Sequence, residues 1–162
     1  MDGKVLTLQY AYLRLIDAQE GKLSQRDEPL DWERVHMASC GRLAWLMALD
    51  RGADPVLAAC AASIHDIGRV LTGKQAGHAA AGEAPAREFL AGLGLFIEEE
   101  IDLLAKAVAA HSSKSVVGNL IEEIVKDADV VDCYQYGLPF ARAEQKKRYE
   151  AWQKGEVFSA GC

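Results

Sequence analysis

The chain has 162 residues, of which 50% are hydrophobic and 26% are charged, and its formal net charge is −6. A chain of this length and composition is expected to fold as one globular domain with a core of its own. Lysine and arginine are scattered through an acidic chain, which argues against binding nucleic acid through the phosphate backbone. No apolar run approaches the roughly 20 residues of a membrane span, and the first residues resemble no signal peptide. We therefore expect a cytoplasmic protein that binds neither nucleic acid nor membranes.

The hydrophobic pattern is helical nearly throughout, and alternating runs of the β type are absent. A first helix is predicted from about Val5 to Gln19 and ends at Gly21. Asp31 is predicted to cap a second helix that runs to about Asp50, because its carboxylate can accept the unpaired amide hydrogens of a first turn.

A third helix is predicted from Pro55 to about Ile67. Gly52 ends the helix before it, Asp54 caps it, and Pro55 takes the first position, where no amide donor is needed. Residues 68–77 contain three glycines and are predicted to be a loop. The remaining predicted helices cover about His78–Ala91, Ile97–Ala110, Val117–Tyr136 and Phe140–Lys154.

These elements predict an all-α bundle of about six to seven helices. We expect a single domain over residues 1–162, with a core at about 30–137. The strongly charged helix at about 140–154 is expected on the surface, after a break at Gly137 and Pro139. Three of the four cysteines, Cys40, Cys60, Cys133 and Cys162, lie in apolar helical contexts and none is closely paired, as in a reduced protein.

Several polar residues interrupt apolar helix faces. His36 shares a face with Cys40 and Met47, and the adjacent pair His65–Asp66 ends an apolar helix. Each has a structural alternative, since a core histidine can bond a carbonyl and Asp66 can cap the next turn. Adjacent helical residues also point about 100° apart, so only strong local curvature or a shared ligand lets both side chains aim at one point.

The predicted helix at 117–136 places Asp129 in line with Ile121 and Val125, on a face that should point inward. An unpaired buried carboxylate is costly, so Asp129 needs a cation or, alternatively, an arginine partner. His78 and His111 lie at helix ends, where the helix dipole alone can favour them. Together, four histidines and these carboxylates are the ligand types of zinc, iron or manganese.

The order H…HD…D, formed by His36, His65–Asp66 and Asp129, resembles the HD-domain superfamily of metal-dependent phosphohydrolases. The segments LAACAASIHDIGR and KDADVVD carry the resemblance, which covers about residues 30–137. It implies an all-α fold in which these four side chains bind one divalent metal ion at a helix terminus.

His78 and His111 extend the resemblance to a subset with the order H…HD…H…H…D, which holds two metals. In that subset Asp66 would bridge the ions, and His78 and His111 would bind the second. The resemblance implies one or two transition-metal ions, of Fe, Mn, Zn, Ni or Co. In many single-metal members, histidines at these places instead bind phosphate or protonate a leaving group. Arg69 departs from the frequent lysine, and the GYP signature of cyclic-di-GMP enzymes is missing.

The resemblance implies hydrolysis of a phosphate ester or anhydride, with a nucleotide as the expected small substrate, by metal-activated water. Asp66, His78 and His111 are the expected catalytic residues, and Asp132 either orients a ligand histidine or forms a surface salt bridge. A di-iron oxygenase on the same scaffold and a non-catalytic metal-binding sensor are the alternatives. The candidate cations for binding substrate phosphate are Arg69, Lys74 and Lys114, and the sequence leaves the oligomeric state open.

Overall fold

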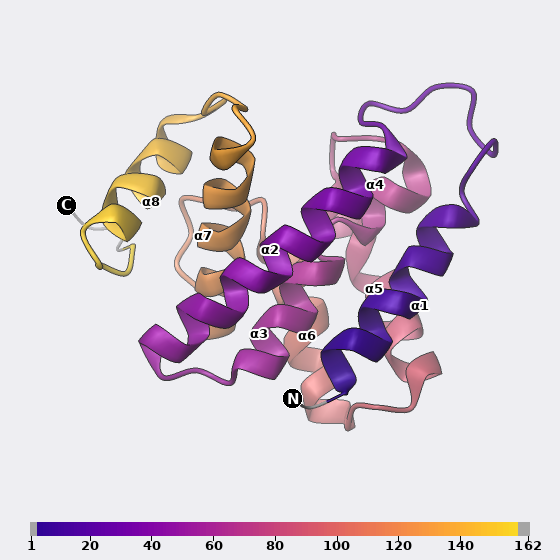
Figure 1. Cartoon of the computed structure of the whole chain (residues 1–162), viewed down its shortest axis with the longest axis horizontal. Helices are drawn as coiled ribbons and strands as arrows, with labels where there is room; N and C mark the ends of the chain where they lie inside the picture. The colour runs from indigo at the N-terminus through magenta and orange to yellow at the C-terminus, as the bar shows by residue number, and fades with distance from the viewer. Residues whose placement is uncertain (1–2, 159–162) are drawn as a thin grey trace.

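The computed structural model describes residues 3–158 and contains only α-helices there, which confirms the predicted fold class. Figure 1 shows α7 and α8 at one end of the bundle, α1, α4 and α5 at the other, and the long helix α2 crossing between them. The helices are α1 (Lys4–Asp17), α2 (Leu30–Arg51), α3 (Pro55–Ile64), α4 (Ile67–Thr72), α5 (His78–Leu93), α6 (Glu98–Ala110), α7 (Leu120–Gln135) and α8 (Ala143–Gln153).

The start of α3 follows the predicted chemistry. The Asp54 carboxylate accepts from the backbone amides of Val56 and Leu57, and Gly52 ends α2 in the left-handed conformation at a φ of 70°. The prediction that Asp31 caps α2 is wrong, because α2 begins at Leu30, two residues before the start that this cap requires, and Pro29 takes the cap position. Asp31 instead lies in the first turn, where an acidic residue favours the helix dipole.

The predicted loop at 68–77 is wrong over its first half. The third helix ends at Ile64 rather than Ile67, and a short helix, α4, follows until Gly73 ends it at a φ of 71°. This gives eight helices in the described residues, one more than expected. His65 and Asp66 lie between α3 and α4, so a change of helix direction falls on the pair itself.

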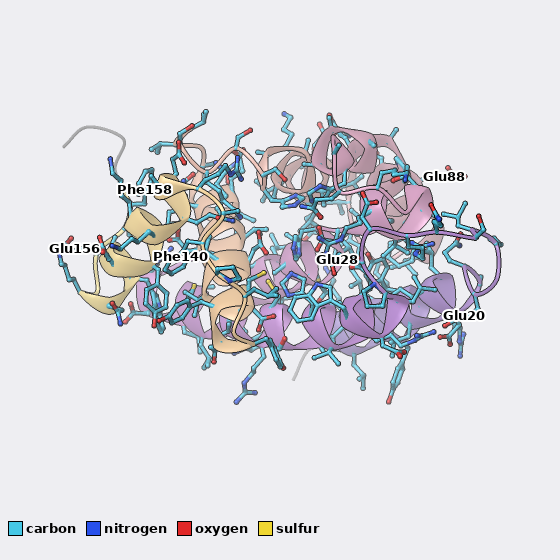
Figure 2. All side chains as sticks on the ribbon, turned by 90° about the horizontal axis from the view of Figure 1, so that it is seen from above. Glu20, Glu28, Glu88, Phe140, Glu156 and Phe158 are labelled. Atoms are coloured by element: carbon cyan, nitrogen blue, oxygen red, sulfur yellow. The ribbon has the colours of Figure 1, made fainter. Side chains whose placement is uncertain are left out.

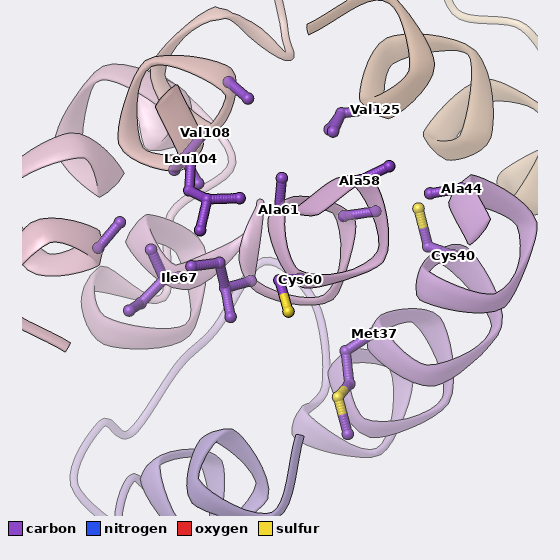
Figure 3. Packing of buried hydrophobic residues seen from close by; sticks show 14 of the residues in the cluster. Met37, Cys40, Ala44, Ala58, Cys60, Ala61, Ile67, Leu104, Val108 and Val125 are labelled. Carbon is purple, nitrogen blue, oxygen red and sulfur yellow. The ribbon is translucent and has the colours of Figure 1, made fainter. Parts of the chain in front are cut away.

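Helix α3 lies at the centre of the core, against α1, α2, α6 and α7. Its side chains are small, and Ala58, Cys60 and Ala61 are fully buried. Figure 3 shows them between Cys40 and Ala44 of α2 and the larger side chains of α6 and α7. Small side chains allow helix axes to approach closely, so α2, α6 and α7 all pass near the end of α3.

Gly68 allows α4 to pack directly on the start of α5. A Cβ atom at this position would lie 2.0 Å from the backbone oxygen of His78 and 2.8 Å from the amide nitrogen of Gly82. Only glycine fits this close approach without movement of backbone, and the approach brings His78 next to Asp66.

The expectation that α8 lies on the surface is wrong for one residue. Arg148 is buried at 1% exposure, and its guanidinium binds Glu123 and Asp127 of α7. Cys40 and Cys60 are buried and Cys133 is partly buried, all as free thiols. Cys162 lies outside the described residues.

Candidate metal centre

His36, His65, Asp66 and Asp129 converge on one point from α2, the α3–α4 junction and α7. The Nε2 atoms of His36 and His65 are 3.2 Å apart. Asp129 Oδ1 lies 3.3 Å from the Nε2 atom of His36, and Asp66 Oδ2 lies 3.2 Å from that of His65. The structure therefore brings together the four residues that the H…HD…D order selects.

His78 and His111 form a second group beside the first, on the other oxygen of Asp66. Their Nε2 atoms are 2.8 Å apart. Asp66 Oδ1 lies 3.0 Å from the Nε2 atom of His78 and 3.5 Å from that of His111. The two oxygens of one carboxylate thus face two different pairs of histidines.

All four histidines are held in the same way, with Nδ1 against an oxygen and Nε2 toward the cluster. A carbonyl oxygen or carboxylate at that distance accepts a hydrogen bond, so Nδ1 carries the hydrogen and the Nε2 lone pair faces inward when the ring is neutral. The Nδ1 contacts are His36 to Asp132 Oδ2 at 2.6 Å, His65 to the Ala62 carbonyl at 2.6 Å, His78 to the Gln75 carbonyl at 2.6 Å and His111 to the Val108 carbonyl at 2.7 Å.

This donor set fits a bound cation. Imidazole nitrogens and carboxylate oxygens that face one another at about 3 Å repel unless a positive charge lies between them. Metal–ligand bonds of about 2.0–2.2 Å place neighbouring ligand atoms roughly 3.0–3.5 Å apart, which is the observed spacing. The Ser112 hydroxyl lies 3.3 Å from His111 Nε2 and 3.5 Å from His78 Nε2, and its one hydrogen can serve only one of them.

The pKa values of histidines and carboxylates in the cluster indicate that the cluster favours an added positive charge. Burial alone lowers the pKa of His65, but the carboxylates of Asp66 and Asp129 raise it to about 10. Burial lowers the pKa of His111 to about 4, against the opposing effect of Asp66. Asp66 and Asp129 keep a pKa well below the ordinary value despite burial, because His65 and Arg69 face the first and Lys114 faces the second. In the metal-free chain a proton on His65 therefore takes the place of a cation.

Two of the three predicted substrate-binding cations lie at the cluster. Arg69 is buried, and it makes a two-point contact to Glu33 at 2.7 and 3.2 Å and a further contact to Asp66. Lys114 Nζ lies 2.5 Å from Asp129 Oδ2.

Lys74 does not reach the cluster. Its side chain is 62% exposed and pairs with Asp27 at 3.7 Å. It follows Gly73, where α4 ends, so the sequence offered no way to predict its direction.

Asp132 and Trp32 hold the ring of His36. Asp132 is buried, and its Oδ2 atom also accepts a hydrogen bond from Ser39, so a surface salt bridge is excluded for it. The indole of Trp32 stacks on His36 with ring centroids 4.8 Å apart, and in this position it supports the imidazole.

Two thiols also approach the cluster, a feature that the sequence analysis missed. Donor atoms of His36, Cys40 and His65 lie within 4.8 Å of one another, and so do those of His36, Asp129 and Cys133. Burial, together with the charge of Asp129, raises the pKa of both thiols, so they stay protonated and neutral in the metal-free chain. The charged donors remain the two carboxylates.

The cluster opens into a small cavity of about 100 Å³, which adjoins a larger one of about 280 Å³. Figure 2 looks onto the bundle with the α8 end, where Phe140 and Phe158 lie, opposite the end that carries Glu20 and Glu88. Loop residues and the start of α8 line both cavities, and sequence reasoning missed them because no periodic pattern marks a loop. The shared lining residues are Gln75, His78, Ser112, Arg142 and Gln145.

The comparison with protein families agrees with the fold and the cluster. The HD domain model matches residues 35–134, which is more than half of the chain. The chain therefore belongs to the HD-domain superfamily of metal-dependent phosphohydrolases, as its H…HD…D order indicated.

Two curated proteins resemble the chain over most of its length. It is 32% identical over 116 residues to ribonuclease Y of Thermobifida fusca, which covers 71% of this chain and 21% of that protein. It is 30% identical over 115 residues to ribonuclease Y of Lactobacillus gasseri, which covers 70% of this chain and 19% of that protein. The chain thus spans about a fifth of the length of these relatives.

A solved structure shares the fold. The crystal structure of a predicted HD superfamily hydrolase from an uncultured Thermotogales bacterium superposes with a TM-score of 0.60 at 21% identity. The superposition covers 91% of this chain and 86% of that one. Within residues 3–158, no helix is long and apolar enough to cross a membrane.

Proposed function

We propose that this protein hydrolyses a phosphate ester or anhydride of a small substrate, with a nucleotide as the first candidate. One observation carries the proposal. The Nε2 atoms of four histidines face a carboxylate whose two oxygens divide between the two pairs of histidines. Such an arrangement supports two adjacent cations bridged by Asp66, which is a frequent design of phosphoryl-transfer sites.

In this proposal His36, His65, Asp66 and Asp129 hold one ion, and Asp66, His78 and His111 hold the second. The ions are divalent transition metals, of Fe, Mn, Zn, Ni or Co, for which imidazole and carboxylate are suitable ligands. When bound, they supply Lewis acidity, which lowers the pKa of a water molecule and neutralises charge that develops on the phosphoryl oxygens.

The buried cations have separate tasks. Lys114 Nζ lies beside Asp129 and lines the small cavity, so it places positive charge where a phosphoryl group enters. Arg69 also lines this cavity, but its donors already bind Glu33, Asp66 and Gln75. Its main task is therefore to hold the Asp66 carboxylate in position, with any contact to substrate secondary to that.

Metal-dependent turnover tests the proposal directly. The purified chain is stripped with a chelator and reloaded with each candidate metal, and hydrolysis of 4-nitrophenyl phosphate and of nucleotides is measured. We expect activity to disappear on chelation and to return with a transition metal. An iron-loaded protein without hydrolysis, but with oxygen-dependent turnover after anaerobic purification, would establish the di-iron oxygenase instead. Stable metal binding without any turnover would support the sensor reading.

An RNA phosphodiester is a second candidate substrate, because the relatives are named ribonuclease Y. The matched region is only about a fifth of those proteins, and the net charge of −6 gives this chain little attraction for a polyanion. Cleavage of a short oligoribonucleotide, measured beside mononucleotide hydrolysis with the same metal, separates the two. Faster turnover of the oligonucleotide would replace the small-substrate proposal.

A further inference from the structure

Most residues that line the larger cavity beside the cluster have no task in the proposed phosphohydrolase reaction. Its volume of about 280 Å³ exceeds the 100 Å³ of the cavity at the histidines. The reacting phosphoryl group would lie in the small cavity, beside the histidines and Lys114, and the rest of a substrate would extend into the adjoining larger cavity. The shared lining residues make the larger cavity the adjoining space.

This outer space carries a single permanent positive charge in its lining. Its lining combines one arginine with small or uncharged polar residues, and within the described chain it includes neither a carboxylate nor a Phe, Tyr or Trp ring. A nucleobase would find no Phe, Tyr or Trp ring to stack on there, whereas an anion would find a cation without a competing acid. The residues are Gln75, Gly77, His78, Ala79, Ser112, Ala141, Arg142 and Gln145.

Arg142 is the cation of this lining, and it is held in place. Its Nη2 atom donates to the Ser112 carbonyl at 2.9 Å, and its backbone amide donates to Gln145 Oε1 at 3.0 Å. The guanidinium has five N–H donors in a fixed plane, so one contact to a carbonyl leaves donors for a phosphate. The side chain is exposed and borders both cavities.

A buried contact fixes the helix that carries this arginine. Arg148, one and a half turns further along the chain, binds Glu123 at 2.9 Å and Asp127 at 2.8 Å, and it donates to the Lys114 carbonyl at 2.7 Å. The last contact ties α8 to the residue whose side chain binds Asp129. Helix α8 lies outside the residues 35–134 that the HD domain model covers.

We propose that the outer cavity binds a second phosphate group of the substrate, and that Arg142 selects substrates that carry one. The proposal rests on the proposed phosphohydrolase function and narrows its substrate to diphosphates and related compounds with two phosphate groups. Arg142 is a specificity residue in this account, because it contacts the group beyond the phosphorus that reacts.

The test compares two substrates across three variants. Values of kcat/KM are measured with 4-nitrophenyl phosphate, which has one phosphate, and with a nucleoside diphosphate. We expect Arg142→Ala to lower the ratio of the diphosphate value to the monophosphate value at least tenfold, mainly through KM, and Arg142→Lys to recover part of the loss. Lys146→Ala, which removes an exposed cation from the same helix, should leave the ratio unchanged. An equal loss on both substrates would show that Arg142 only positions the Ser112 loop, and would overturn the proposal.

A binding measurement separates this proposal from the proposed function. Calorimetry with the metal-loaded protein gives the Kd of inorganic pyrophosphate and of inorganic phosphate. We expect Arg142→Ala to weaken pyrophosphate binding about tenfold more than phosphate binding. If the wild-type protein hydrolyses neither substrate, the phosphohydrolase function fails, while this difference in Kd still decides whether the second phosphate site exists. Equal changes in the two Kd values would reject the site.

Discussion

Helix α7 carries two buried groups of charged side chains, and they differ in what completes them. On one side, Glu123 and Asp127 face arginine and lysine donors: Arg148 binds both, and Arg51 pairs with Asp127 at 2.8 Å. On the other side, Asp129 faces the Nε2 atoms of His36 and His65, which are lone-pair acceptors when neutral. The protein itself supplies the positive charge of the first group. In the second group Lys114 reaches one oxygen of Asp129, and in our proposal a bound metal ion supplies the remaining positive charge.

The partners of a buried charged residue therefore indicate whether its role is structural or functional. A closed ion-pair network contributes to one defined arrangement of helices, here the docking of α8 on α7. Under the proposed function, the acceptor-rich cluster of His36, His65, Asp66 and Asp129 would destabilise the metal-free fold and would gain stability on binding metal. Residues two positions apart on one helix, Asp127 and Asp129, thus belong to different networks because they point in different directions.

The largest effect is expected from removing a histidine of the acceptor cluster. His65→Ala should lower phosphohydrolase turnover at least about a thousandfold, because several kcal/mol of transition-state stabilisation come from the metal. The fold should survive, since His65 contributes no ion pair to α8. Turnover and far-UV circular dichroism check this together. An unfolded His65→Ala variant would favour a structural or sensor role for the metal.

Breaking the ion-pair network of Arg148, Glu123 and Asp127 should reduce stability and leave metal binding intact. Arg148→Met leaves Glu123 and Asp127 buried without one partner, and we expect a loss of roughly 3–5 kcal/mol in the free energy of unfolding. Denaturant titration measures this loss. Metal content at a temperature where the variant stays folded should match that of the wild type. Loss of metal from a folded Arg148→Met variant would show that the two groups are coupled through Lys114.

A smaller effect is expected from the contact that orients His36. Asp132→Asn keeps the shape of the side chain but removes the charge that faces His36 Nδ1 at 2.6 Å. Metal affinity should fall about 10–100-fold, as for other carboxylate partners of ligand histidines. Competition with a coloured chelator measures the affinity. Asp127→Asn is the matched control on the same helix, and an equal loss of affinity in both variants would contradict a specific role for Asp132.

The last effect is a pH dependence confined to the metal-free chain. Asp66 and Asp129 raise the pKa of His65 to about 10 against the effect of burial, whereas an unfolded histidine has a value of about 6.5. Protonated His65 therefore stabilises the metal-free fold fully below about pH 6.5, and this contribution is lost as pH rises toward 10. Denaturant titrations of chelator-treated wild type and His65→Ala between these pH values measure it. Identical slopes in the two proteins would contradict the assignment.

The sequence predicted the acceptor cluster far better than the closed network. His36, His65–Asp66 and Asp129 follow a family order, and helical spacing put Asp129 on an inward face, so their convergence was foreseeable. Arg148 lies in a helix of charged residues with no apolar stripe, and only its partners on α7 determine that it is buried. Because the docking of α8 depends on those partners, Arg142 and Gln145 could not be predicted as lining residues.

The short helix α4 was the other feature that the sequence did not predict. Helix α4 has six residues between Asp66 and Gly73, too few for a periodic pattern, and the glycine-rich sequence favoured a loop. The close packing of Gly68 on His78 decides this segment, and it is a tertiary contact. The direction of Lys74, which leaves the site, follows from the same local geometry.

Metal content per chain tests the central claim most directly. The wild-type protein, loaded and then freed of excess metal, is measured by elemental analysis beside the His78→Ala and His111→Ala variants. Two bridged ions predict about two metals per chain in the wild type and about one in each variant. One metal per chain in all three proteins would contradict a dinuclear centre bridged by Asp66.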